Sequence, residues 1–283
     1  MSRDPGGARG WTALRIRPSS ADAAPLVSAA LFASGSLGIQ EDGDVLVTQL
    51  EGAEQVAAAR AAVLRADPEA QLETAPVPDV DWSEEWRKGI HAHRLGALVV
   101  TPPWLAGDYG EAERIVIEPG MAFGTGEHAT TRGVVRLMQR AIRPGDRVAD
   151  LGAGSAVLSI AAARLGAGSV AAIELDPEAI GNAEANVARN GVADRVRVVE
   201  GDAGVLLPLL APVRLVLANI ISSVLVALLP AIADALTADG QAILSGILLE
   251  ERVRMLDVLA STGWRVEAED AEDVWWSALI SRR

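Results

Sequence analysis

The spacing of hydrophobic and polar positions changes along this chain and divides it into two parts. Between residues 11 and 76, three strand-like segments (11–17, 37–50 and 70–77) enclose two segments with helical spacing (20–35 and 52–67). The middle segment contains a hairpin signal at Asp42-Gly43. The resulting order β-α-β-β-α-β predicts a small ferredoxin-like α+β domain over residues 1–76.

From about residue 132 onward, apolar runs alternate with helical segments. The predicted strands span 147–153, 169–176, 195–202, 214–220 and 241–247, and the helices 155–166, 177–190, 221–237 and 248–261. Residues 264–283 add two strands joined by an acidic loop. This alternation predicts a Rossmann-like α/β domain over 93–283, with a mostly parallel seven-stranded sheet and an antiparallel edge strand. Residues 77–92 are predicted to link the two domains.

Composition narrows the possible functions. Half of the residues are hydrophobic, which is typical of a globular protein with a substantial core. There is no cysteine, which excludes disulfides and thiolate chemistry, and the histidines His91, His93 and His128 lack zinc-like spacing. The net charge of −13 disfavours direct nucleic-acid binding and suits a basic partner, although it also suits plain solubility. With no signal-like or membrane-spanning segment predicted, we expect a cytoplasmic protein.

The turn after the first parallel strand carries an acid where a dinucleotide site would not. Gly152 and Gly154 fit a glycine-rich turn, but the third position of the dinucleotide fingerprint is Val157. Asp150, two residues before the first glycine, would repel a pyrophosphate and attract an ammonium group. The turn therefore favours S-adenosylmethionine, which has an amino-acid end and a cationic sulfonium.

Acids also follow the next two strands. Glu174 lies 22 residues after Gly152 (174 − 152), where an acid can accept hydrogen bonds from ribose hydroxyls. Asp176 precedes Pro177 and is predicted to cap the next helix. Asp202 is placed to bind the adenine amino group, and a helix-cap or turn-cap role is equally open for it.

The fourth parallel strand ends in Asn219. Its amide oxygen can accept hydrogens from an amine and thereby aim the nitrogen lone pair at a methyl group. Because methyl transfer is an in-line displacement, such positioning contributes much of the acceleration. The sequence therefore predicts catalysis at Asn219, without a metal.

Five segments together resemble the ribosomal protein L11 methyltransferase family: "DWSEEWRKGIHAHRLGALVVTPPW", "EPGMAFGTGEHATTR", "DLGAGSAVLSIAAARLGA", "IELDPEAI" and "LANII". The resemblance implies a class I methyltransferase domain and S-adenosylmethionine-dependent methylation of lysine side chains and the α-amine of the basic ribosomal protein L11. It also implies that the N-terminal domain recognises the substrate. Carried over by position, the cofactor ligands are Thr131, Gly152, Glu174 and Asn219.

The chain departs from the family pattern at its first glycine-rich segment. Where the family has G-T-G-T-H-P-T-T, this chain has Glu127, His128 and Ala129 in the middle. We interpret this segment as a flexible cover from which Thr131 reaches the cofactor, while Glu127 and His128 face the incoming amine as candidate bases. Bulk water is the alternative base.

The strand turn and the ribose acid also depart from the family. Ala153 and Ala156 replace a cysteine and a third glycine, and Glu174 replaces an aspartate. We expect cofactor binding to survive these changes.

Three alternatives stay open at this point. A related enzyme could methylate lysines of another protein, or a small-molecule amine, with the same cofactor residues. A nucleotide-dependent oxidoreductase with a degenerate fingerprint is disfavoured by Asp150 and Val157. A non-catalytic binding module would require that the changes at 127–129 have silenced the site.

Overall fold

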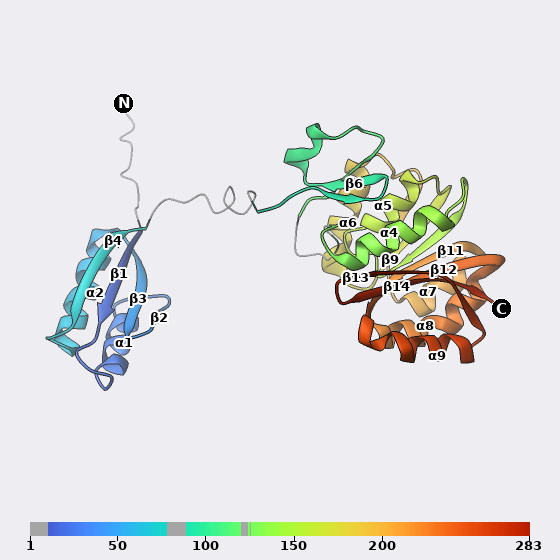
Figure 1. The fold of residues 1–283 in the computed structure, drawn as a ribbon. Coiled ribbons are helices and arrows are strands. Elements are labelled where there is room, and N and C mark those ends of the chain that lie inside the picture. The colour runs from blue at the N-terminus through green and yellow to red at the C-terminus, as the bar shows by residue number, and fades with distance from the viewer. Residues whose placement is uncertain (1–10, 78–88, 120–123, 125) are drawn as a thin grey trace, which may run out of the picture. The chain divides into compact units, whose positions relative to one another are not determined.

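A computed structural model describes residues 11–77, 89–119, 124 and 126–283 of the chain (Figure 1). The chain forms two compact units, Met1–Gly89 and Ile90–Arg283. Most of the predicted linker, residues 78–88, lies outside the described residues. In the part of the chain that is described, no helix is long and apolar enough to cross a membrane.

The N-terminal unit has the predicted β-α-β-β-α-β order. Its elements are β1 (Trp11–Arg17), α1 (Ala24–Ala33), β2 (Gln40–Asp42), β3 (Val45–Glu51), α2 (Gly52–Ala66) and β4 (Gln71–Pro76). The antiparallel sheet has the strand order β2-β3-β1-β4. Inward-facing strand residues such as Leu14 and Ile16 pack against Val27, Leu31 and Val63 of the helices. The predicted ferredoxin-like arrangement is confirmed.

The C-terminal unit is built on a seven-stranded sheet in the order β10-β9-β8-β11-β12-β14-β13. Its strands are β8 (Arg147–Leu151), β9 (Ser169–Glu174), β10 (Val196–Glu200), β11 (Val213–Asn219), β12 (Leu236–Leu248), β13 (Trp264–Glu272) and β14 (Trp275–Arg282). Its α-helices are α4 (Ala129–Ala141), α5 (Val157–Arg164), α6 (Pro177–Arg189), α7 (Ala203–Leu210), α8 (Ser222–Ala235) and α9 (Arg252–Ser261), and the 3-10 helix η2 (Leu249–Glu251) precedes α9. The predicted Rossmann-like fold is confirmed.

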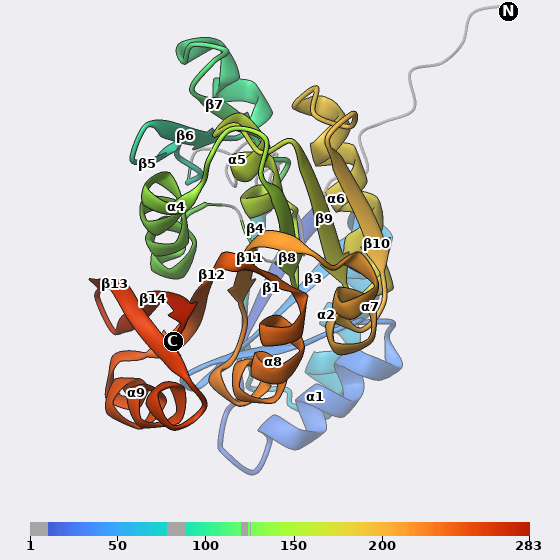
Figure 2. The same ribbon diagram turned by 90° about the vertical axis from the view of Figure 1, so that its right-hand side faces the viewer.

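Helices cover both faces of this sheet, as Figure 2 shows. Successive residues of β11 point to opposite faces: Leu215 and Leu217 pack in the core with α4, α5 and α6, whereas Val216 and Ala218 pack in the core with α7, α8 and α9. A strand buried on both faces needs a continuous apolar run, which explains the sequence "LVLA" that directly precedes Asn219.

Two features of the C-terminal hairpin differ from the prediction. The antiparallel strand is β14, which lies between β12 and the edge strand β13 rather than at the edge. The acidic residues from Glu267 to Glu272 belong to β13 and not to a loop, and the turn consists of Asp273 and Val274. Alternation along β13 exposes Glu267 and Glu269, whereas Asp270 and Glu272 are partly buried and pair with arginines of α4, so a strand was compatible with their charge.

A small three-stranded sheet precedes α4. It contains β5 (His93–Leu95), β6 (Leu98–Thr101) and β7 (Arg114–Val116), with the 3-10 helix η1 (Pro103–Asp108) between the last two. The strands β6 and β7 are parallel, and β5 is antiparallel to β6. This sheet leads directly into residues 118–128, which we call the glycine loop.

Candidate functional site

The carboxyl ends of β8, β9, β10 and β11 lie at one edge of the sheet, because these strands are parallel neighbours. Four of the predicted site residues stand at or next to these ends: Asp150, Glu174, Asp202 and Asn219. The strand turn, residues 152–156, connects β8 to α5 at the same edge. In open α/β sheets this edge is the ordinary ligand-binding position.

Backbone contacts hold the strand turn. The N–H groups of Gly152 and Ala153 donate to the carbonyl of Ile173, at 2.9 and 3.0 Å. Gly152 has φ +71°, and a Cβ there would stand 2.6 Å from the side chain of Ile220, which follows β11. Glycine is therefore required at 152 by conformation and by space.

Glu174, at the end of β9, holds this turn through its carboxylate. Its Oε2 accepts a 2.7 Å hydrogen bond from the N–H of Gly154, and its Oε1 accepts from the N–H groups of Leu175 and Asp176, at 2.8 and 2.9 Å. A carboxylate offers about four lone-pair directions. Glu174 therefore retains room for about one further donor, which suits one ribose hydroxyl rather than both.

Two neighbouring aspartates cap helices. Asp176 accepts from the N–H of Glu178 at the start of α6, as predicted. Asp202 accepts from the N–H groups of Gly204 and Val205 at the start of α7, through Oδ1 at 2.7 and 3.2 Å. The cap role left open for Asp202 is thus present, and this cap uses only one of its two carboxylate oxygens.

Asp150 is completely buried beneath the turn. Ser159 donates a 2.6 Å hydrogen bond to its Oδ2, while its Oδ1 has no hydrogen-bond partner among the described residues. Desolvation raises the pKa of Asp150 to about 6, the Ser159 hydrogen bonds oppose this, and the charge of Glu174 adds to it. A buried carboxylate oxygen without a donor is costly unless a ligand satisfies it.

The glycine loop is fastened to the strand turn. Ser155 Oγ donates to the carbonyl of Gly124 at 2.6 Å. Gly124 has φ +107°, and a Cβ there would stand 2.7 Å from Ser155 Oγ. Asn186 of α6 donates to the carbonyl of Ser155 and accepts from the N–H of Glu118, both at 3.1 Å. The two glycine-containing segments are therefore in direct contact.

Helix α4 starts where the glycine loop ends. His128 is the N-cap residue, and its Nδ1 lies 3.4 Å from the N–H and 2.7 Å from the hydroxyl of Thr130. Thr131, one residue further, is completely buried, and its Oγ1 has no hydrogen-bond partner within the described part of the chain. Thr131 thus resembles Asp150: each buries an oxygen without a donor or acceptor.

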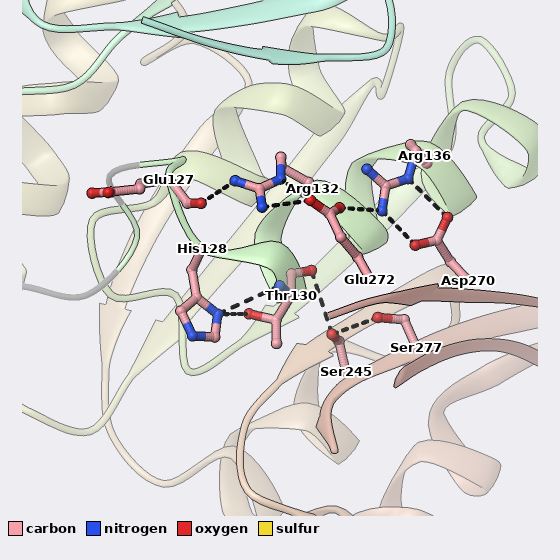
Figure 3. Close-up of polar contacts among 9 residues, drawn as sticks. All are labelled: Glu127, His128, Thr130, Arg132, Arg136, Ser245, Asp270, Glu272 and Ser277. Carbon is pink, nitrogen blue, oxygen red and sulfur yellow. Dashed lines mark hydrogen bonds and ion pairs between the residues drawn. The ribbon is translucent and has the colours of Figure 1, made fainter. Parts of the chain in front are cut away.

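The start of α4 also contacts β12, next to the end of β11 that carries Asn219. Ser245 Oγ donates to the carbonyl of Thr130 at 3.4 Å and shares a 2.7 Å hydrogen bond with Ser277 Oγ (Figure 3). Ser245 is also the register partner of Asn219 in the β11–β12 pair. The fold therefore brings the end of the glycine loop close to Asn219, although the two are about ninety residues apart.

Next to this contact lies a hollow of about 390 Å³. It is lined by Gly124, Glu127, His128, Ala129, Arg132, Asp273 and Trp275. The rings of His128 and Trp275 meet edge to face, with centroids 4.9 Å apart. Carboxylates and aromatic rings on one surface suit a cationic side chain.

His93, one of the histidines without zinc-like spacing, lies close to the glycine loop. It is half-buried at the start of β5, opposite Val100 of β6, on which Gly126 packs. Desolvation lowers the pKa of His93, against the charge of Glu127, and the charge of Arg132 lowers it further.

Several residues that shape the site escaped the sequence analysis. Ser155, Asn186, Arg132, Glu272 and Trp275 each reach the glycine loop or its exit from another element. Only Ser155 had a usable signal, because it lies inside the strand turn. The others depend on contacts between segments far apart in the chain.

Comparisons with known proteins agree with this geometry. The family model described as Ribosomal protein L11 methyltransferase (PrmA) matches residues 21–283. A ribosomal protein L11 methyltransferase of Pelotomaculum thermopropionicum is 43% identical over 239 residues, covering 83% of this chain and 76% of that protein. One of Thermus thermophilus is 42% identical, covering 70% of this chain and 76% of that protein.

A solved structure is similar as well. The crystal structure of ribosomal protein L11 methylase from Lactobacillus delbrueckii subsp. bulgaricus is 33% identical and has a TM-score of 0.61. The match covers 69% of this chain and all of that one. The chain belongs to the ribosomal protein L11 methyltransferase family, as its motifs predicted.

Proposed function

We propose that this site binds S-adenosylmethionine and methylates amines of ribosomal protein L11. The observation that carries the cofactor proposal is the pair of buried oxygens without partners, Asp150 Oδ1 beneath the strand turn and Thr131 Oγ1 at the exit of the glycine loop. Unsatisfied buried polar atoms are rare and mark sites where a ligand is expected. The two glycine-containing segments that carry them are in contact.

The described residues fit the parts of this cofactor. Asp150 carries negative charge for the ammonium group, and Gly152 and Gly154 allow a close backbone approach. Glu174 retains about one acceptor position for a ribose hydroxyl, and Asp202 has Oδ2 outside its helix cap for the adenine amino group. When bound, the cofactor supplies a methyl group on a cationic sulfonium.

Asn219 is proposed to position the acceptor amine. It stands at the end of β11 and is half-buried, and within the described residues no side chain holds its amide. Its oxygen is thus available to accept a hydrogen from the amine and to orient the nitrogen lone pair. Orientation of this kind can contribute much of the acceleration of an in-line transfer.

Glu127 and His128 are proposed to face the amine from the hollow. His128 is held through Nδ1, which lies 2.7 Å from the hydroxyl and 3.4 Å from the N–H of Thr130. Glu127, His128 and bulk water are the proposed acceptors of the proton that the amine must lose. The Glu127 carboxylate would also attract a cationic lysine.

Ribosomal protein L11 is proposed as the partner because the matching relatives are named for it and because the chain, at −13, suits a basic protein. Lysine side chains and the α-amine are the proposed acceptors. The N-terminal unit, residues 1–76, is the proposed recognition domain, joined through 77–92 to the catalytic domain 93–283. The same charge disfavours nucleic acid as a direct partner, and we propose a cytoplasmic location with no membrane partner.

The test is to incubate the full chain with ribosomal protein L11 and labelled S-adenosylmethionine and to map the methylated residues by mass spectrometry. We expect label on lysines and on the α-amine. Asn219→Ala should lower kcat much more than cofactor affinity. Label on a different protein, or on a small amine alone, would support the alternative acceptors. Binding of NADH in place of S-adenosylmethionine would overturn the proposal.

A further inference from the structure

A chain of ion pairs joins α4 to the C-terminal hairpin (Figure 3). Arg136 donates to both oxygens of Asp270, at 2.8 and 2.5 Å, and to Glu272 at 2.7 Å. Arg132 donates from Nε to Glu272 at 2.8 Å. The four side chains are only 20–35% exposed, so solvent screens these pairs less than ordinary surface pairs.

Arg132 differs from Arg136 in one respect. Its Nη1 donates to the backbone carbonyl of Glu127, the last residue before the His128 cap. One planar guanidinium therefore holds a carboxylate of the hairpin and the backbone of the glycine loop together, an arrangement that lysine cannot reproduce. Among the described residues, the side chain of Arg136 donates only to Asp270 and Glu272, which both belong to β13.

The hairpin tip, residues 272–275, forms one wall of the hollow. Asp273 and Trp275 line it opposite Glu127 and His128 of the glycine loop. Arg132 lies between these two walls and contacts both Glu272 and the Glu127 carbonyl. Arg132 thus bridges the two walls, in addition to the edge-to-face contact between His128 and Trp275.

We propose that Arg132 and Glu272 are positioning residues, which hold the glycine loop at a set distance from the hairpin tip and so shape the opening through which the acceptor amine enters. This inference rests on the proposed function of the site. The pKa of Glu272 is lowered mainly by its hydrogen bond from Arg132, so this contact favours the carboxylate form of Glu272. Neither residue is proposed to touch the reacting atoms.

The experiment compares Arg132→Gln with Arg136→Gln in the full chain. Arg136→Gln is a matched control, because it breaks an ion pair between the same helix and the same strand without a recorded contact to the loop. For Arg132→Gln we expect the KM for ribosomal protein L11 to rise and kcat to fall, each about tenfold, because small misplacements slow positioned reactions. The Kd for S-adenosylmethionine should change less than about twofold.

Two further variants test the geometry. Arg132→Lys should be impaired like Arg132→Gln, because lysine keeps the charge but lacks the planar guanidinium that donates to two acceptors at once. The double variant Arg132→Gln/Glu272→Ala should be no worse than Arg132→Gln alone, because coupled residues are not additive. Equal loss of activity in Arg132→Gln and Arg136→Gln would show that both ion pairs only stabilise the fold, and would overturn the proposal.

A measurement without turnover separates this claim from the proposed function. The ring resonances of His128, assigned with His128→Gln, should shift in Arg132→Gln and stay unchanged in Arg136→Gln. Unshifted resonances in both variants would refute the positioning role even if ribosomal protein L11 is methylated. Shifted resonances in a protein that does not methylate ribosomal protein L11 would refute the proposed function alone.

Discussion

The two glycine-containing segments meet at one edge of the sheet and are held in different ways. The strand turn is fixed by its own neighbours: the N–H groups of Gly152 and Gly154 bond to the adjacent strand β9, through Ile173 and Glu174. The glycine loop is fixed by side chains from other elements, namely Ser155, Asn186 and Arg132. Backbone N–H groups thus bond the strand turn to the sheet, whereas side chains of other elements hold the glycine loop.

This difference explains why one chain has two such segments. A strand turn whose backbone bonds to the sheet gives a rigid support for a cofactor. A loop held by a few side-chain contacts can adapt to what enters, and it carries Glu127 and His128 on the side of the hollow. We therefore expect the two segments to bind the cofactor together, and the glycine loop to connect the cofactor to the acceptor.

The largest predicted effect comes from separating the two segments. Gly124→Ala places a Cβ at 2.7 Å from Ser155 Oγ, on a residue with φ +107°. The steric and conformational costs together predict a loss of affinity for S-adenosylmethionine of about 10²-fold, measured by calorimetry.

Gly191→Ala is the control for backbone strain. Its φ is +64°, and a Cβ there would have no heavy atom within 4 Å. It should lower the free energy of unfolding by about 1 kcal/mol and leave the affinity unchanged. If Gly124→Ala leaves the affinity for S-adenosylmethionine unchanged, as this control does, the contact between the glycine loop and the strand turn is not required for cofactor binding.

The second prediction concerns the pH dependence of stability that the buried Asp150 causes. Desolvation raises the pKa of Asp150 from 3.8 to about 6 in the folded protein. Its protonated form is thus favoured by folding, and the stability that it contributes is present below pH 3.8 and is lost as the pH rises through 6. Asp150→Asn should remove this dependence, so the wild type should lose about 2 kcal/mol relative to the variant between pH 4 and pH 7.

Urea unfolding of both proteins without cofactor measures this difference. The Asn variant should also bind S-adenosylmethionine more weakly at pH 7, because it has no charge for the ammonium group. Parallel stability curves across this pH range would show that Asp150 does not titrate as predicted.

The third prediction compares two adjacent threonines. Thr131→Val removes a buried hydroxyl that has no partner among the described residues, so the free energy of unfolding should stay equal or rise. Its affinity for S-adenosylmethionine should fall about tenfold, the value of a buried hydrogen bond to a ligand. Thr130→Val removes a hydroxyl bonded to His128 and should instead destabilise the protein. Unchanged affinity in Thr131→Val would remove Thr131 from the cofactor site.

The smallest predicted effect lies inside the turn itself. Ala156 is buried and has φ +64°, in the left-handed region that favours glycine. Ala156→Gly should raise the free energy of unfolding by about 1 kcal/mol, seen as a Tm increase of about 2–4 °C. Asp273→Gly, at φ +54°, should change it less, because aspartate tolerates this region. A lower Tm for Ala156→Gly would show that the methyl group's packing outweighs the strain.

The same contrast separates what the sequence could predict from what it could not. The sheet, the helices and the strand turn follow from short apolar runs and from residues only a few positions apart, so their pattern is visible locally. The anchors of the glycine loop are not: Ser155 lies 31 residues from Gly124, and Glu272 lies 140 residues from Arg132. No periodicity connects such pairs, because they meet only once the sheet has formed.

The acidic C-terminal hairpin shows the same limit in another form. Its carboxylates suggested an exposed loop, since charge and turns are correlated. Asp270 and Glu272 are instead strand residues whose partners, Arg132 and Arg136, lie on α4. Sequence separation, and not chemical type, decided which parts of the site could be predicted.

The central claim is that the glycine loop and the strand turn bind one S-adenosylmethionine together. Hydrogen exchange tests it most directly, by following the backbone amides of residues 126–131 and 152–156 as cofactor is titrated into the full chain. We predict that both sets become protected together and saturate at one cofactor per chain. Protection confined to residues 152–156, with the loop amides unchanged, would contradict the claim.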